Sequence, residues 1–337
     1  MRKIQMLALV CILAISAFSQ HNQKGFTLVI HGGAGTILKK NMTPEREKAY
    51  LAALDSALQT GYKILEAGGS ALEAVQATVM VMENSPLFNA GKGAVFTNEG
   101  KNELDAAIMD GFTLKAGSVA GITTIKNPIT AARAVMDKSE HVMMSGKGAD
   151  QFAAQQGCEV VDPSYFYTED RFRGLQRAKE RDANKVDSSN AGLRNPMHRD
   201  EKYGTVGAVA VDKQGRLAAA TSTGGMTNKK WGRIGDAPII GSGTYANQQV
   251  AISCTGWGEY FIRLVMAKSI ADRMEFGKQS LKDAANQLIM IELPRLGGDG
   301  GLVAVDKNGN VAMPFCTEGM YRGYIRSNGQ KEILIYK

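Results

Sequence analysis

Two stretches in the second half of the chain share one pattern, and that pattern requires antiparallel strands. "GAVAVDKQGRLAAATST", residues 207–223, reads as an alternating strand, a turn containing Gly215 and a second strand. "GLVAVDKNGNVAMPFCT", residues 301–317, places Asp306 and Gly309 at the same offsets. Alternating apolar runs joined by Asp and Gly are typical of β-hairpins. The sequence therefore predicts two hairpins.

Helical patterns surround these hairpins. Apolar residues recur at three- and four-residue steps from Pro44 to Glu66, and Ser70 with Glu73 forms a capping-box signature for a second helix. Between the hairpins, similar patterns run from about Tyr260 to Phe276 and from Ser280 to Leu293. Strands followed by helices and then by strands predict an α+β layered fold with largely antiparallel sheets.

The segment from about Glu169 to Gly204 breaks the pattern. It has few large apolar residues and many charges of both signs, and Ser, Asn, Gly and Pro gather near its end. We predict a flexible linker here. A charged surface helix over "RGLQRAKERD" is the alternative for part of it, though not past Asp187. A linker this long inside a compact domain usually serves a function.

The first twenty residues are typical of a secretory signal. Arg2 and Lys3 precede an apolar run, and Ala17 and Ser19 stand at the spacing that a signal peptidase reads. The apolar run is shorter than the roughly 20 residues needed to cross a bilayer, which argues against a membrane anchor. We expect residues 1–19 to be removed and the protein to be exported, to the periplasm or beyond, with no membrane partner afterwards.

Charge and cysteine content exclude other classes. Without Arg2 and Lys3 the formal net charge falls from +7 to +5, and no dense basic block with aromatics remains, so a nucleic-acid partner is not expected. Cys158, Cys254 and Cys316 are odd in number and widely spaced, which predicts neither a disulfide framework nor a metal site.

A hydrolase of this sequence needs a nucleophile that does not depend on a histidine base. The four histidines are scattered, and no HExxH, GxSxG or P-loop motif occurs. A threonine can instead use its own free α-amine, whose ordinary pKa of about 7.7–8.0 suits a base near neutral pH. Thr205 begins the first hairpin, but a free amine there requires cleavage after Gly204, whose missing side chain permits unusual backbone geometry. On this dipeptide alone, an ordinary loop-to-strand junction is the simpler interpretation.

Residues downstream strengthen the catalytic interpretation. Thr223 ends the hairpin next to two glycines that let a ligand approach. Arg233 and Asp236 are suited to bind a carboxylate and an ammonium on one small molecule, although an ordinary surface ion pair would leave the same pattern. The Thr255 hydroxyl and the Gly256 N–H are adjacent donors that suit a developing oxyanion.

Together these segments resemble a known family. "HGGAG", "PLFNAGKGAVF", "GTVGAVAVD", "TSTGGMTNK", "GRIGD", "SCTGWGE" and "TEGMYRG" occur in the order found in plant-type L-asparaginases, also called isoaspartyl peptidases, which are N-terminal nucleophile hydrolases. The resemblance implies an αββα four-layer sandwich. It also implies a precursor that cleaves itself into residues 20–204 and 205–337, which stay associated, and a homodimer of such processed units.

The resemblance also assigns catalytic roles. Thr205 matches the nucleophile and new N-terminus, and Thr223 matches the threonine beside it. Thr255 and Gly256 match the oxyanion hole, and Asn89 matches a residue that hydrogen-bonds near the nucleophile.

Substrate and ion binding are assigned in the same way. Arg233 and Asp236 match the groups that bind the substrate α-carboxylate and α-amine, and Gly258 matches a pocket glycine. Trp257 stands where the family often has a smaller residue. No catalytic cofactor is implied. A structural sodium ion is implied, bound by the backbone carbonyls of Met82, Glu83, Ser85, Phe88, Ala90 and Lys92.

The predicted activity is hydrolysis of small β-aspartyl substrates through a threonine ester. The substrates are the side-chain amide of L-asparagine and the isopeptide bond of isoaspartyl dipeptides. Two alternatives remain: a glycosylasparaginase with the same nucleophile, and a non-catalytic exported protein that binds an amino acid.

Overall fold

Two β-sheets form the centre of the protein in this computed structural model, which describes residues 25–186 and 204–337. The larger sheet contains β1 (Thr27–Gly35), β2 (Leu104–Asp110), β3 (Ala116–Ile122), β4 (Met143–Ser145), β5 (Val206–Val211), β6 (Leu217–Thr223), β11 (Gly319–Arg326) and β12 (Lys331–Tyr336), in the spatial order β12-β11-β1-β5-β6-β2-β3-β4. The smaller sheet contains β7 (Thr244–Ala246), β8 (Val250–Gly256), β9 (Gly300–Asp306) and β10 (Val311–Ala312), in the order β10-β9-β8-β7. Only β3 and β4 pair in parallel, so the predicted antiparallel arrangement is confirmed.

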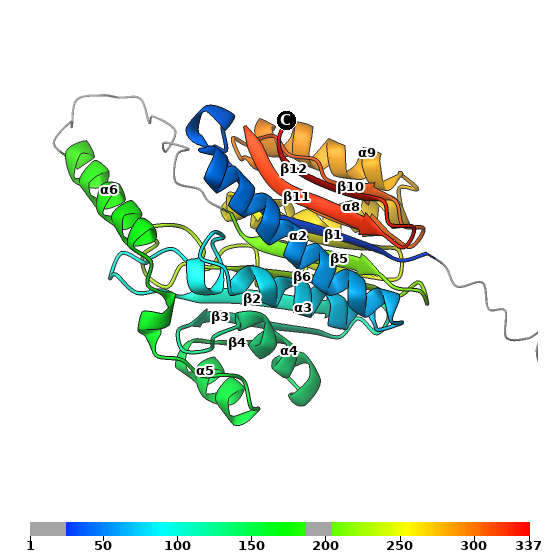
Figure 1. Cartoon of the computed structure of the whole chain (residues 1–337), viewed down its shortest axis with the longest axis horizontal. Helices are drawn as coiled ribbons and strands as arrows, with labels where there is room; N and C mark the ends of the chain where they lie inside the picture. The colour runs from blue at the N-terminus through cyan, green and yellow to red at the C-terminus, as the bar shows by residue number, and fades with distance from the viewer. Residues whose placement is uncertain (1–24, 187–203) are drawn as a thin grey trace, which may run out of the picture.

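Helices cover the outer face of each sheet (Figure 1). Beside the larger sheet lie α2 (Pro44–Glu66), α3 (Ala71–Glu83), α4 (Pro128–Lys138) and α5 (Gly146–Gln155), and beside the smaller sheet lie α7 (Gly258–Leu264), α8 (Met266–Glu275), α9 (Leu281–Asn286), the π-helix Gln287–Glu292 and α10 (Leu293–Arg295). Short 3₁₀ turns occur at Lys39–Asn41, Gly91–Gly93 and Pro163–Phe166. Within the described residues, no helix is both long and apolar enough to span a bilayer.

The alternation of side-chain direction along the strands explains how sheets and helices stack in layers. In β1, Leu28 and Ile30 join the core beneath α2 and α3, whereas Val29 joins the core between the sheets. Val209 of β5 and Val303 of β9 meet Val29 in that second core. A third core lies between the smaller sheet and its helices. Because successive strand residues point to opposite faces, both faces of each sheet are buried. The expected αββα sandwich is therefore confirmed.

The two predicted hairpins have matching turns. Asp212 and Asp306 each accept hydrogen bonds from the N–H groups two and four residues later, at 2.8–3.0 Å. Gly215 and Gly309 both take the positive φ that such turns need, +77° and +79°. The second hairpin differs in its return strand, since β10 has only two residues.

The predicted helix starts agree with the structure. α2 begins at Pro44, and the Thr43 hydroxyl accepts a hydrogen bond from the Arg46 N–H at 3.3 Å. At the start of α3, Ser70 and Glu73 form the complete capping box. Both helices pack on strands of the larger sheet, and α3 contacts β5 and β6, which support the site described below.

The single helix predicted from Tyr260 to Phe276 is wrong, because Val265 interrupts it with a φ of +43°. The N–H groups of Ala267 and Lys268 donate to the carbonyls of Ser242 and Gly241, at 3.2 and 2.8 Å. These tertiary bonds start a new helix, and periodicity along the sequence cannot show them.

The linker predicted from Glu169 also begins too early, because α6 (Glu169–Val186) is helical. Arg173 forms an ion pair with Glu169 one turn away at 2.8 Å, and the Phe172 ring lies 5.5 Å from that of Phe96. Figure 1 shows α6 extending away from the two sheets. The rest of the predicted linker, residues 187–203, and the predicted signal peptide lie outside the described residues.

Candidate active site

The hairpin of β5 and β6 brings Thr205 against Thr223. Thr205 directly precedes β5 and is 8% exposed, and its hydroxyl donates to Thr223 Oγ1 at 3.2 Å. Thr223 ends β6, and its oxygen also accepts the Gly225 N–H at 2.9 Å. The Gly225 bond fixes Thr223, and Thr223 in turn fixes the direction of the Thr205 hydroxyl.

Gly204 is enclosed on several sides. A Cβ atom there would lie 2.3 Å from Gly33 Cα and 2.6 Å from Thr255 Oγ1. The prediction that Gly204 permits the backbone geometry of cleavage stays a prediction, and the structure adds a second reason for a glycine at this position. The missing side chain lets the bond between residues 204 and 205 lie against β1 and the Thr255 hydroxyl.

Thr255 and Gly256 lie together at the end of β8. The fully buried Thr255 hydroxyl accepts the Ala34 N–H at 3.2 Å, which leaves its own proton available to an oxyanion. Gly256 has a φ of +151°, and a Cβ atom there would lie 2.4 Å from the Asp299 carbonyl oxygen. The predicted pair of donors therefore lies at one end of a strand, beside Gly204.

A small cavity of about 40 Å³ joins these groups to the predicted head-group binders. The residues that line it include Thr205, Thr223, Arg233, Asp236, Gly256 and Trp257. The structure thus brings together residues as far apart in the sequence as Ala34 and Trp257.

Arg233 has a partner that the sequence analysis missed. Its Nε and Nη2 groups donate to the two carboxylate oxygens of Glu259, both at 2.8 Å. The ion-pair alternative was thus right about pairing, but the partner is Glu259 rather than Asp236. Glu259 lies in the first turn of α7, within the "SCTGWGE" segment, and an acidic residue after a pocket glycine was the available signal.

Asp236 is a buried carboxylate with an unused oxygen. It is 5% exposed, and Oδ2 has no hydrogen-bond partner. Desolvation by burial raises its pKa to about 7, against the opposing effect of Arg233, and the Glu259 charge adds to the rise. An unpaired buried acceptor beside a cavity suits a ligand ammonium.

Gly258 allows these charges to meet. A Cβ atom there would lie 2.8 Å from Asp236 Oδ1 and 2.9 Å from Arg233 Nη2. Any larger residue at the start of α7 would displace one of them. The structure therefore places Gly258 against Arg233 and Asp236, the predicted binding groups, where the absence of a side chain leaves room for both.

His31 does not fit the role of a base. It is fully buried in β1, and desolvation lowers its pKa to about 3. Its Nε2 lies 2.8 Å from the Ser253 hydroxyl. A histidine this weakly basic would accept few protons near neutral pH. His141 is exposed, and His21 and His198 lie outside the described residues.

Comparison with known proteins matches this arrangement. A family model described as "Asparaginase" matches residues 24–335. The chain belongs to the asparaginase family. It is 53% identical to an isoaspartyl peptidase of Escherichia coli over 298 residues, which cover 88% of this chain and 92% of that protein. It is 49% identical over 345 residues to a putative isoaspartyl peptidase/L-asparaginase of Dictyostelium discoideum, with 93% and 99% covered. A plant-type L-asparaginase of Pyrococcus abyssi is 41% identical over 302 residues, with 89% and 96% covered.

In this member of the asparaginase family, Asn89 supports the turn beside Thr223. Its Nδ2 donates to the Gly225 carbonyl at 2.8 Å, and its Oδ1 accepts the Val95 N–H at 3.0 Å. Asn89 is 2% exposed. It therefore holds the turn that directly follows Thr223, which agrees with its predicted position.

The loop that carries Asn89 has crowded carbonyl groups. A Cβ atom on Gly91 would lie 2.4 Å from the Glu83 carbonyl oxygen, and one on Gly93 would lie 2.0 Å from that of Phe88. The Lys92 ammonium lies 5.4 Å from the centre of the Tyr165 ring. Among residues 25–186 and 204–337, no group of three His, Cys, Asp or Glu could hold a metal ion. An ion in this loop would therefore depend on backbone oxygens.

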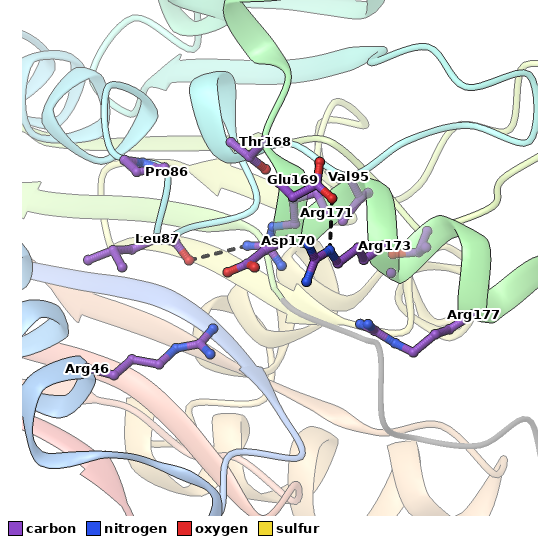
Figure 2. Close-up of a pocket in the computed structure, with 12 residues that line it drawn as sticks. Arg46, Pro86, Leu87, Val95, Thr168, Glu169, Asp170, Arg171, Arg173 and Arg177 are labelled. Carbon is purple, nitrogen blue, oxygen red and sulfur yellow. Dashed lines mark hydrogen bonds and ion pairs between the residues drawn. The ribbon is translucent and has the colours of Figure 1, made fainter.

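A much larger cavity, about 690 Å³, lies apart from these residues (Figure 2). The start of α6, Arg46 and the Pro86–Leu87 segment line it. Arg171 donates to the Leu87 carbonyl at 3.2 Å and to the Gly93 carbonyl at 2.9 Å. Its arginines thus serve the protein's own structure, and none of the predicted site residues line it.

Proposed function

We propose that this protein is an autoprocessed amidohydrolase that acts on L-asparagine and on β-aspartyl dipeptides. The observation that carries the proposal is the small cavity, which holds a threonine hydroxyl, an arginine and an unpaired buried carboxylate oxygen. Arginine and carboxylate together suit the α-carboxylate and α-ammonium of an aspartyl group. The names of the relatives, isoaspartyl peptidase and L-asparaginase, support the same substrates.

The first reaction is cleavage of the chain by itself. The Thr205 hydroxyl attacks the Gly204 carbonyl carbon, the C–N bond breaks, and an ester to Thr205 Oγ1 forms with the α-amine released. Water then hydrolyses the ester, which leaves a carboxylate on Gly204 and a free hydroxyl and amine on Thr205. The Thr255 hydroxyl, packed against Gly204, is placed to stabilise the developing oxyanion.

The second reaction repeats this chemistry on a substrate. The free α-amine of Thr205 takes the hydroxyl proton, and the oxygen attacks the β-carbonyl carbon. Thr255 and Gly256 donate to the oxyanion. The leaving nitrogen takes the proton and departs as ammonia or as an amino acid. Water, activated by the same amine, then hydrolyses the β-aspartyl ester to release aspartate.

Arg233 and Asp236 fix the substrate during both halves of the reaction. Two N–H groups of Arg233 already bind Glu259, so its remaining Nη1 group faces the substrate carboxylate. Asp236 accepts from the substrate ammonium through Oδ2. Both contacts involve the aspartyl part alone, so asparagine and β-aspartyl dipeptides bind in the same way.

A structural sodium ion forms part of the proposal. The carbonyls of Met82, Glu83, Ser85, Phe88, Ala90 and Lys92 would hold it. The loop fits because Gly91 and Gly93 allow two of these oxygens to approach the turn. The ion would supply no chemistry; it would neutralise carbonyl dipoles and keep Asn89 in place.

Export after removal of residues 1–19, and a homodimer of processed units, complete the proposal. Export rests on the residue pattern at the start of the sequence. The dimer rests on family resemblance.

The direct test supplies asparagine, β-aspartyl-leucine and glycosylasparagine side by side to wild-type protein and to Thr205→Ala. We expect the first two compounds to be hydrolysed by wild type only. Faster turnover of glycosylasparagine than of both would favour a glycosylasparaginase. Binding of aspartate without turnover, unchanged in Thr205→Ala, would favour a binding protein and overturn the proposal.

A further inference from the structure

The cavity at Thr205 cannot enclose a whole dipeptide. Its volume is about 40 Å³, whereas pockets that enclose larger ligands measure about 300–1,000 Å³. Arg233, Asp236 and Thr205 all line it, and so does Gly204, which cleavage detaches from Thr205. The aspartyl part of the substrate therefore takes the space among these residues once Gly204 has moved away. The group bonded to the β-carbonyl must therefore lie at the rim of the cavity.

Trp257 forms one side of this rim. It lines the cavity directly after Gly256 and is half-buried. Its ring meets the Tyr260 ring edge-on, with centres 5.0 Å apart, and the Arg263 guanidinium lies 5.4 Å from the Tyr260 ring centre. Residues at three-residue steps share one side of a helix. The start of α7 thus presents two aromatic rings and then a positive charge.

Trp231 lies at the tip of a tight turn, two residues before Arg233, which lines the cavity. The Arg233 N–H closes the turn on the Lys230 carbonyl at 3.0 Å. Trp231 and Gly232 have φ of +57° and +67°, as in a type I′ turn, where Gly, Asn and Asp dominate. Trp231 is nevertheless 93% exposed. A bulky residue in a strained conformation with its ring in water is a candidate functional position.

We propose that Trp257, assisted by Trp231, forms a leaving-group subsite that selects β-aspartyl dipeptides whose second residue has a large apolar side chain. The chain has only two tryptophans, and each is adjacent or close in sequence to a residue that lines the cavity. This inference rests on the proposed function. It adds a preference that the aspartyl-binding groups cannot supply, since they do not reach the second residue.

The charges near these rings favour a dipeptide over a sugar. The Lys230 ammonium lies 5.9 Å from the centre of the Trp231 ring, and Arg263 lies beside Tyr260. The second residue of a dipeptide carries a free α-carboxylate, which these cations attract. The sugar of glycosylasparagine is uncharged and gains nothing from them.

The test compares kcat/KM for β-aspartyl-phenylalanine, β-aspartyl-glycine, glycosylasparagine and asparagine. Wild type should prefer the phenylalanine dipeptide to the glycine dipeptide by about tenfold or more. In Trp257→Ala this ratio should fall below about threefold. Trp231→Asn keeps a residue that tolerates positive φ and should lower the ratio less.

Phe276→Ala is the matched control, because Phe276 is a 73% exposed aromatic residue that does not line the cavity. It should keep the wild-type ratio. Intact mass, which detects the fragment beginning at Thr205, reports whether Trp257→Ala is folded and processed.

Four results would overturn the inference. Equal rates for the two dipeptides in wild type, or a preference that survives in Trp257→Ala, would refute the subsite while leaving the proposed function intact. Glycosylasparagine as the substrate most sensitive to Trp257→Ala would assign the rings to a sugar. Failure of wild type on all four compounds would refute the proposed function, and this inference with it.

Discussion

The cavity at Thr205 and the cavity at the start of α6 differ in size and in chemistry. The larger, about 690 Å³, is rich in arginine, but Arg171 is bound to the carbonyls of Leu87 and Gly93, and Arg173 to Glu169. The smaller, about 40 Å³, contains the Thr205 hydroxyl and the unpaired Oδ2 of Asp236. Proteins rarely leave a buried carboxylate oxygen without a partner. The larger cavity also has a buried oxygen without a partner, on the Thr168 hydroxyl, but no carboxylate oxygen among the described residues that line it is both buried and unpaired. The combination of a threonine hydroxyl, an arginine and an unpaired buried carboxylate oxygen, rather than volume, therefore identifies the site.

Among substitutions in the smaller cavity, removal of an oxyanion donor should lower the activity most. We expect Thr255→Val to lower kcat by about 10²–10³-fold, because its hydroxyl is one of two proposed donors. Self-cleavage should slow as well, since Thr255 packs against Gly204. Thr255→Ser is the control that keeps the hydroxyl. Turnover by Thr255→Val at the wild-type rate would remove Thr255 from the mechanism.

The pH dependence of the reaction should be the next clearest effect. Burial raises the Asp236 pKa from 3.8 to about 7, so this carboxyl is neutral below pH 7 and then cannot hold an ammonium as an ion pair. kcat/KM should therefore fall as pH decreases through about 7. The Thr205 amine, with an ordinary pKa of about 7.7–8.0, must also be neutral. The acid limb of the pH profile, the range over which kcat/KM falls, will therefore reflect both groups.

Glu259→Gln distinguishes the effect of the Asp236 carboxyl on the pH profile from that of the Thr205 amine. The Glu259 charge raises the Asp236 pKa, so its removal should move the limb to lower pH. Asp55→Asn, which removes a surface carboxylate paired with Lys331, should leave the limb in place. An unmoved limb in Glu259→Gln would mean that Asp236 does not set it.

A substitution in the larger cavity should change the activity least. Arg173→Ala removes an exposed arginine whose ion-pair partner is Glu169, and neither residue lines the smaller cavity. We expect kcat/KM for asparagine to stay within about twofold of wild type, as for most surface substitutions. A loss comparable to that of Thr255→Val would show that the larger cavity takes part in the reaction, and the distinction between the cavities would fail.

Local signals predicted much of the fold. The capping box at Ser70 and the turns at Asp212 and Asp306 involve residues two to four positions apart, so the sequence displays them directly. The break at Val265 was missed because it depends on bonds from Ala267 and Lys268 to a distant loop. The charged helix given as the alternative over "RGLQRAKERD" is confirmed within α6, and its early start at Glu169 was missed because it depends on contacts such as that of Phe172 with Phe96.

The residues of the site divide in the same way, into those that short motifs predicted and those whose contacts depend on distant segments. Thr205, Thr223, Arg233 and Asp236 were found from short motifs, and the structure brings them to one cavity. Glu259 was missed because its pairing with Arg233 depends on how the start of α7 folds back over the loop before β7. The crowding around Gly204 could not be predicted for a similar reason, since it comes from β1 and β8.

The central claim is that the chain creates its own base by cleavage before Thr205. The most direct test is intact mass and N-terminal sequencing of purified full-length protein over time, with asparagine hydrolysis measured on the same samples. We predict two fragments, one beginning at Thr205 and the other ending at Gly204, with activity rising as they appear. A folded chain that stays in one piece yet hydrolyses asparagine would contradict the account.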